Sequence, residues 1–97
     1  MPAYMIITAR IHDREKFVQG YGKEDARLVE RFGGEYVVRA PGAVALEGEH
    51  GDGASVVVSQ WPDKAAALAF WNSADYAQVR KLREGIAECS VLVVETP

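Results

Sequence analysis

A group of aromatic and arginine side chains near the C-terminal end could bind an acidic small molecule. Tyr76, Arg80 and Arg83 follow one another at spacings of four and three, which places them along one side of a helix. Trp71 precedes this helix. Guanidinium groups offer paired donors that match a carboxylate or an enolate, and aromatic walls exclude water from that contact. The alternative is that the two aromatic residues belong to the core, while the arginines pair with glutamates or solvent.

Two further residues could transfer protons. His12 lies at the end of a predicted strand, near the expected mouth of a pocket, and a histidine titrates near neutral pH. Asp25 interrupts an apolar helical stripe, and a buried carboxylate would have a raised pKa and could act as a general base. The alternatives are a His12 without a role in a capped turn, and an Asp25 at a helix edge, bonded to Tyr21 or to a neighbouring strand.

The remaining polar candidates are an ion pair and a thiol. Arg39 and Glu47 flank a bend at Pro41, and they could reach the same pocket or pair with each other across a hairpin. Cys89 has no basic neighbour in sequence to lower its pKa, so we expect a buried, inert thiol. It is the only cysteine, and no Cys/His cluster has the spacing of a zinc site. We therefore predict no metal and no cofactor.

The patterning of the chain predicts the strands and helices that must hold these residues. Runs of consecutive apolar residues predict strands that are covered on both faces, at 4–11, 55–59 and 89–95. Another strand, at 35–39, is broken by Pro41 and resumes over 43–47. It is an edge strand or one bulged at the break, because proline has no amide to donate. Capping residues and apolar stripes predict helices over 14–32, 64–71 and 74–84.

This order of elements predicts one α+β domain over residues 1–97, with a ferredoxin-like βαββαβ antiparallel sheet. The first and third strands are central, and both helical layers lie on one face. The other face is then an apolar patch larger than a soluble monomer normally exposes. A second copy that meets it sheet to sheet about a two-fold axis is the simplest cover, so we predict a homodimer.

Composition excludes several classes of partner. The net charge is −3 with interspersed signs, whereas nucleic-acid binding depends on a clustered basic face. We find no signal peptide and no apolar run near the ~20 residues that span a membrane. We therefore expect a cytoplasmic protein with neither a nucleic acid nor a membrane as partner.

Three segments resemble DUF1330 proteins in order and approximate spacing. They are GGEYVVR at 33–39, LEG at 46–48, and FWNSADY at 70–76 with Arg80 and Arg83 after it. The resemblance covers almost the whole chain and implies membership of the dimeric α/β-barrel superfamily, with the same sheet-to-sheet dimer. His50 stands in a turn where relatives often carry an aromatic residue.

The resemblance does not select one function. Superfamily relatives include cofactor-independent monooxygenases, EthD-like degradation proteins, chlorite dismutase-like haem enzymes and muconolactone isomerases. One hypothesis is a homodimeric small-molecule-binding protein, or a cofactor-independent monooxygenase- or isomerase-like enzyme, acting on a small aromatic or enolisable acid. The other is a non-catalytic dimeric module whose interior is filled by its own side chains. A pocket of ~300 Å³ or more would favour the first hypothesis.

Overall fold

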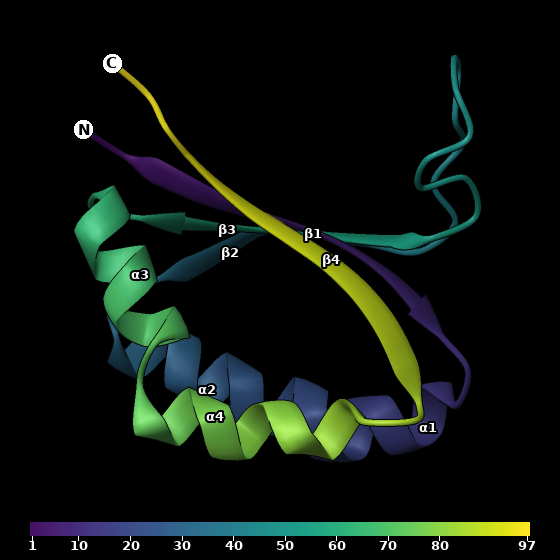
Figure 1. The fold of residues 1–97 in the computed structure, drawn as a ribbon, viewed down its shortest axis with the longest axis horizontal. Helices are drawn as coiled ribbons and strands as arrows, with labels where there is room; N and C mark the ends of the chain where they lie inside the picture. The colour runs from purple at the N-terminus through teal and green to yellow at the C-terminus, as the bar shows by residue number, and fades with distance from the viewer.

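A computed structural model describes residues 1–97 as a four-stranded antiparallel sheet with helices on one face (Figure 1). The strands are β1 (Ala3–Ile11), β2 (Glu35–Ala40), β3 (Ser55–Trp61) and β4 (Ala87–Glu95). They are ordered β2-β3-β1-β4, so β1 and β3 are central and β2 and β4 form the edges. The predicted α+β class and the two predicted central strands are confirmed. No helix combines the length and the apolar character needed to cross a bilayer.

The first helical stretch contains one widened turn. It consists of α1 (Arg14–Phe17), η1 (Val18–Gly22) and α2 (Lys23–Arg31), which follow one another without a gap. Asp13 caps the stretch as predicted, because its Oδ1 accepts a hydrogen bond from the Lys16 amide at 3.1 Å. In η1 the Lys23 amide reaches back five residues to the Val18 carbonyl, as in a π-helix. The helix predicted over 14–32 is therefore present, but it is not regular.

The second helical layer has two capped helices. These are α3 (Lys64–Trp71) and α4 (Ala74–Arg80), and α4 continues into a 3₁₀ turn, η2 (Lys81–Arg83). Asp63 Oδ1 accepts from the Ala66 amide at 2.8 Å, and Ser73 Oγ accepts from the Tyr76 amide at 3.0 Å. Both predicted N-caps are confirmed, because each side chain satisfies an amide that has no partner inside its helix.

The segment after β2 is a loop, so the predicted return to a strand over 43–47 is wrong. Glycines at 42, 48, 51 and 53 have positive φ and turn the chain repeatedly. The Ala45 amide bonds to Asp52 Oδ1 at 3.0 Å instead of a neighbouring strand. The loop rises from the sheet on the side opposite the helices (Figure 1), and Leu46 in it is 96% exposed.

The core lies between the sheet and the helices, around Trp61, Phe70 and Tyr76. The Trp61 and Phe70 rings are tilted with centroids 5.0 Å apart, and those of Phe70 and Tyr76 are 4.7 Å apart. Trp61 Nε1 donates to Ser59 Oγ at 2.9 Å, which satisfies its only polar group. The tryptophan ring also lies close to Gly34, which stands between α2 and β2.

We expect Gly34→Ala to lower the free energy of unfolding by about 1–3 kcal/mol, as overpacking of a core does. A Cβ at this position would lie 2.7 Å from Trp61 Cζ2, and this buried indole is held by its packing on Phe70 and its bond to Ser59. Urea unfolding followed by tryptophan fluorescence measures the loss. Gly20→Ala is the matched control, because its Cβ would meet nothing within 4 Å. Equal stability of the two variants would contradict the steric account.

Candidate functional site

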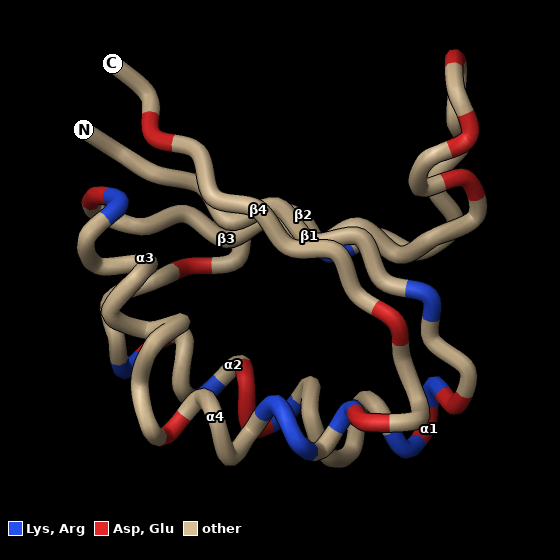
Figure 2. Tube along the Cα trace, in the orientation of Figure 1, with Lys and Arg blue, Asp and Glu red and all other residues tan.

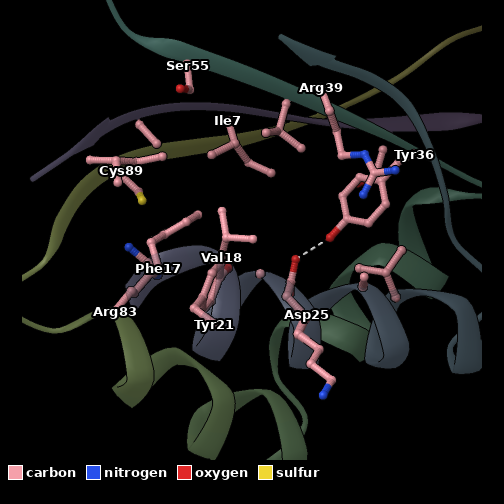
Figure 3. A pocket seen from close by; sticks show the side chains of 18 of the residues that line it. Ile7, Phe17, Val18, Tyr21, Asp25, Tyr36, Arg39, Ser55, Arg83 and Cys89 are labelled. Carbon is pink, nitrogen blue, oxygen red and sulfur yellow. Dashed lines mark hydrogen bonds between the residues drawn. The ribbon is translucent and has the colours of Figure 1, made fainter. Parts of the chain in front are cut away.

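A cavity of about 540 Å³ lies between the helix-facing side of the sheet and the helices (Figure 3). Apolar side chains such as Ile7 and Val57 form its roof, and aromatic side chains form much of its floor. Exposed residues from η1 and from the end of β2, including Val18 and Arg39, belong to its lining, so it opens between these two segments. The interior is therefore not filled by the protein's own side chains, and the volume lies within the range of ligand pockets.

The widened turn in the first helical stretch aligns one wall of the cavity. Phe17, Tyr21, Asp25 and Val29 all line it, at an unbroken spacing of four residues. In a regular helix, which has 3.6 residues per turn, side chains four residues apart would move progressively around the helix axis and away from the cavity. The wider turn in η1 takes up the excess and keeps these side chains on the cavity side.

Asp25 is the buried carboxylate of the cavity. It is 7% exposed, and its Oδ2 accepts a hydrogen bond from the Tyr36 hydroxyl (Figure 3). Its Oδ1 is buried and has no partner. Burial raises the pKa of Asp25 to about 6, against the lowering effect of the Tyr36 hydrogen bond and of the Arg83 charge. Asp25 is therefore mostly ionised at neutral pH, with one free oxygen that can accept a proton or a hydrogen bond.

A β-bulge brings Tyr36 and Arg39 to the same side of the sheet. The pairing with β3 shifts between Tyr36 and Val38, so that Tyr36 lies opposite Ser59 and Arg39 opposite Val57, and all four line the cavity. The Arg39 guanidinium carbon lies 4.8 Å from the centre of the Tyr36 ring. Burial raises the pKa of the Tyr36 hydroxyl, and the Asp25 charge adds to this, so Tyr36 stays protonated and donates to Asp25.

The wall next to α4 and η2 contains Tyr76 and the Arg83 guanidinium, and Tyr21 of the first helical stretch contacts both. The hydroxyls of Tyr21 and Tyr76 are hydrogen-bonded at 2.9 Å, and Trp71 packs on Tyr76 with centroids 5.1 Å apart. The Arg83 guanidinium carbon lies 5.4 Å from the centre of the Tyr21 ring. Its Nε is buried and has no hydrogen-bond partner. This wall can therefore present a positive charge and a free donor to an anion.

The structure brings most of the predicted site residues together. Those that line the cavity are Asp25, Arg39, Trp71, Tyr76 and Arg83. The two that do not are His12, whose side chain is 57% exposed with Nε2 3.7 Å from Glu88 Oε1, and Arg80. The Arg80 guanidinium lies over the Trp71 ring at 5.3 Å, so the two predicted helix arginines do not share one cavity. Glu47 also lies outside the cavity and forms no ion pair with Arg39.

Several cavity residues were not predicted as site residues. Tyr21 had a usable signal, since it stands four residues before Asp25 on the same helical stripe. Tyr36 had no signal in the sequence, because the bulge decides which side of the sheet its side chain faces. Cys89 also lines the cavity; burial raises the pKa of its thiol, while the Arg83 charge lowers it. No group of three or more His, Cys, Asp or Glu side chains could hold a metal ion.

Comparison with known proteins identifies a family and a fold. The model of a family described as a domain of unknown function, DUF1330, matches residues 2–97, which confirms the resemblance seen in the sequence. The structure is similar to that of RPA0582, a protein of unknown function from Rhodopseudomonas palustris. The TM-score is 0.78 at 18% identity, over 99% of this chain and 82% of that chain. No curated protein matches the sequence.

Two further similar structures are those of a possible oxidoreductase and of an oxygenase. One is a conserved protein of unknown function, and possible oxidoreductase, from Bacteroides thetaiotaomicron (TM-score 0.70, 15% identity, 98% of this chain and 97% of that chain). The other is SnoaB, a cofactor-independent oxygenase from Streptomyces nogalater (TM-score 0.72, 12% identity, 99% of this chain and 93% of that chain). At these identities the likeness shows the fold alone.

Proposed function

We propose that this chain, which belongs to the DUF1330 family, binds a small aromatic or enolisable acid in its cavity and uses Asp25 to accept a proton from it. The observation that carries the proposal is a buried carboxylate with a free oxygen, placed on the same apolar cavity as a guanidinium with a free donor. Aromatic side chains from α1, η1, β2, α3 and α4 line the same cavity. Such a combination of apolar walls and a few convergent polar groups is typical of ligand sites.

The two groups suit a proton abstraction. The proton would pass from a C–H or O–H bond of the ligand to Asp25 Oδ1, and the electron pair of that bond would stay on the ligand as an enolate or phenolate. Arg83, which also lines the cavity, would stabilise the resulting negative charge. Tyr36 holds the other oxygen of Asp25 and so fixes the orientation of the base. A fold shared with a cofactor-independent oxygenase is compatible with such chemistry.

A thermal-shift titration with aromatic acids tests whether the cavity binds them through Arg83. We expect a ligand at a hundredfold excess over its Kd to raise the melting temperature of the wild type by roughly 10–20 °C. Arg83→Ala should lose this shift, measured against its own melting temperature without ligand. Arg80→Ala is the matched control, because Arg80 also lies against an aromatic ring but outside the cavity. Equal shifts in the two variants, or no shift in the wild type, would exclude the proposed site.

We also propose that the sheet is covered by a second copy of the chain. The side of the sheet opposite the helices, here called the open face, carries an aliphatic row across all four strands: Val38, Val58, Ile6 and Leu92. Arg10, Glu35, Glu88 and Glu95 lie near the ends of their strands, and Arg39 lines the cavity on the other side of the sheet, so this row carries no charge (Figure 2). A pair of such faces about a two-fold axis would bury both rows. The order β2-β3-β1-β4 is consistent with the ferredoxin-like sheet that we propose for each half of a dimeric α/β barrel.

A further inference from the structure

Two buried side-chain atoms in the protein lack a hydrogen-bond partner, and both belong to residues that line the cavity. They are Asp25 Oδ1 and Arg83 Nε. Buried polar atoms in native proteins are almost always paired, so each exception calls for an explanation. Because the two unpaired atoms share one cavity, the simplest explanation is that its occupant pairs with both.

No hydroxyl of the protein bonds to Asp25 Oδ1 or to Arg83 Nε. The Tyr36 hydroxyl bonds to the other oxygen of Asp25, and the hydroxyls of Tyr21 and Tyr76 bond to each other. Asp25 is 7% exposed, so bulk solvent does not reach its carboxylate freely. The unpaired oxygen therefore depends on whatever enters the cavity.

The two atoms need partners of opposite kinds. An ionised carboxylate only accepts hydrogen bonds, and the Nε of an arginine only donates one. A simple aromatic acid such as benzoate can pair with Arg83 but offers nothing to Asp25. A simple phenol can pair with Asp25 but leaves Arg83 without an anion. A molecule that carries both functions would pair with both atoms.

We infer that the ligand is a hydroxylated aromatic acid or a similar enol acid, with its hydroxyl on Asp25 Oδ1 and its carboxylate or carbonyl on Arg83 Nε. The inference rests on the proposed function and adds the class of ligand to it. The apolar and aromatic walls suit the ring between the two polar ends. The same contact places the acidic O–H of the ligand where Asp25 can take its proton.

Calorimetric titration with matched acids tests the inference. The probes are 3- and 4-hydroxybenzoate, their methoxy counterparts, and benzoate, at pH 7.5. A methoxy group keeps the oxygen but cannot donate, and a hydrogen bond to a charged group changes affinity roughly 10- to 100-fold. We expect at least one hydroxybenzoate to bind more tightly than its methoxy counterpart by this factor.

Two variants separate the two contacts. Asp25→Asn should abolish or reverse the preference for the hydroxyl, because its amide group can turn a donor toward the cavity while its oxygen accepts from Tyr36. Arg83→Ala should weaken the binding of the hydroxy and the methoxy acids by a similar factor. The ratio of their Kd values should therefore stay the same.

The outcomes distinguish the inference from the proposed function. Equal binding of hydroxy and methoxy acids to the wild type, with loss of both in Arg83→Ala, would overturn the ligand class and leave the proposed site intact. An unchanged ratio in Asp25→Asn would show that another group recognises the hydroxyl and would also overturn it. Absence of binding by all five acids would overturn both.

Discussion

The Asp25→Asn variant is expected to be more stable than the wild type at neutral pH, by up to about 3 kcal/mol. The pKa of Asp25 is about 6 in the folded chain, against a usual value of 3.8. Between these values the folded chain holds a proton that the unfolded chain has released. The stability contributed by Asp25 is therefore greatest at low pH, falls as the pH rises through this window, and stays low above it. Asparagine carries no charge at any of these pH values, so the variant does not lose this stability.

Urea unfolding of both proteins at pH 4, 5, 6 and 7.5 measures the effect. The quantity to compare is the difference in free energy of unfolding between variant and wild type, because the other acidic residues are common to both. We expect this difference to be smallest at pH 4 and to reach its full size above pH 6. A difference that is the same at pH 4 and at pH 7.5 would mean that Asp25 does not titrate with a raised pKa.

Tyr36→Phe provides a control of opposite sign. The Tyr36 hydroxyl donates to the carboxylate and lowers the pKa of Asp25, so its removal should raise that pKa further. The variant should lose more stability at pH 7.5 than at pH 4. Together the two variants would show that the chain retains a carboxylate that lowers its stability at neutral pH. Such a trade is typical of residues kept for binding or chemistry.

Local signals in the sequence predicted most of the elements. Asp13, Asp63 and Ser73 could be predicted as N-caps from the sequence, because an N-cap acts locally. Each side chain accepts from an amide only three residues further along the chain. The central strands β1 and β3 were readable because they carry apolar residues on both faces. The loop after Pro41 could not be predicted, because Ala43 to Leu46 have the composition of a strand. Only the surrounding glycines and the bond to Asp52 keep this segment out of the sheet.

The site was only partly predictable, because two irregularities shape it. Residues three apart on a regular strand face opposite sides, so Tyr36 and Arg39 share a side only through the bulge at Val37. The π-turn in η1 similarly decides which residues of the first helical stretch face the cavity. Both depend on packing against other segments. Asp25 was predictable as a buried carboxylate because a carboxylate within an apolar stripe is conspicuous without any tertiary information. The alternative of a bond to a neighbouring strand is also confirmed, since Tyr36 lies in β2.

Leu92→Arg is expected to convert a dimer of this protein into a monomer. In β4 Val91 and Val93 face the helices, so Leu92 faces the other way, and it lies opposite Ile6 in the middle of the open face. Leu92 is 56% exposed in the single chain, so the substitution should cost the fold little. In a two-fold dimer each substitution occurs twice and brings like charges into an apolar interface. We expect this to raise the Kd of the dimer roughly a thousandfold.

Light scattering at micromolar concentration gives the mass directly. The wild type should show twice the 10.6 kDa of one chain, and Leu92→Arg should show the single mass. Leu82→Arg is the matched control, because Leu82 is 46% exposed but lies in η2, in the helical layer. It should remain a dimer. A wild type with the mass of one chain would refute the dimer, whereas a dimer broken by Leu82→Arg and not by Leu92→Arg would place the interface on the helices. In that case the aliphatic row of Val38, Val58, Ile6 and Leu92 would need a different cover.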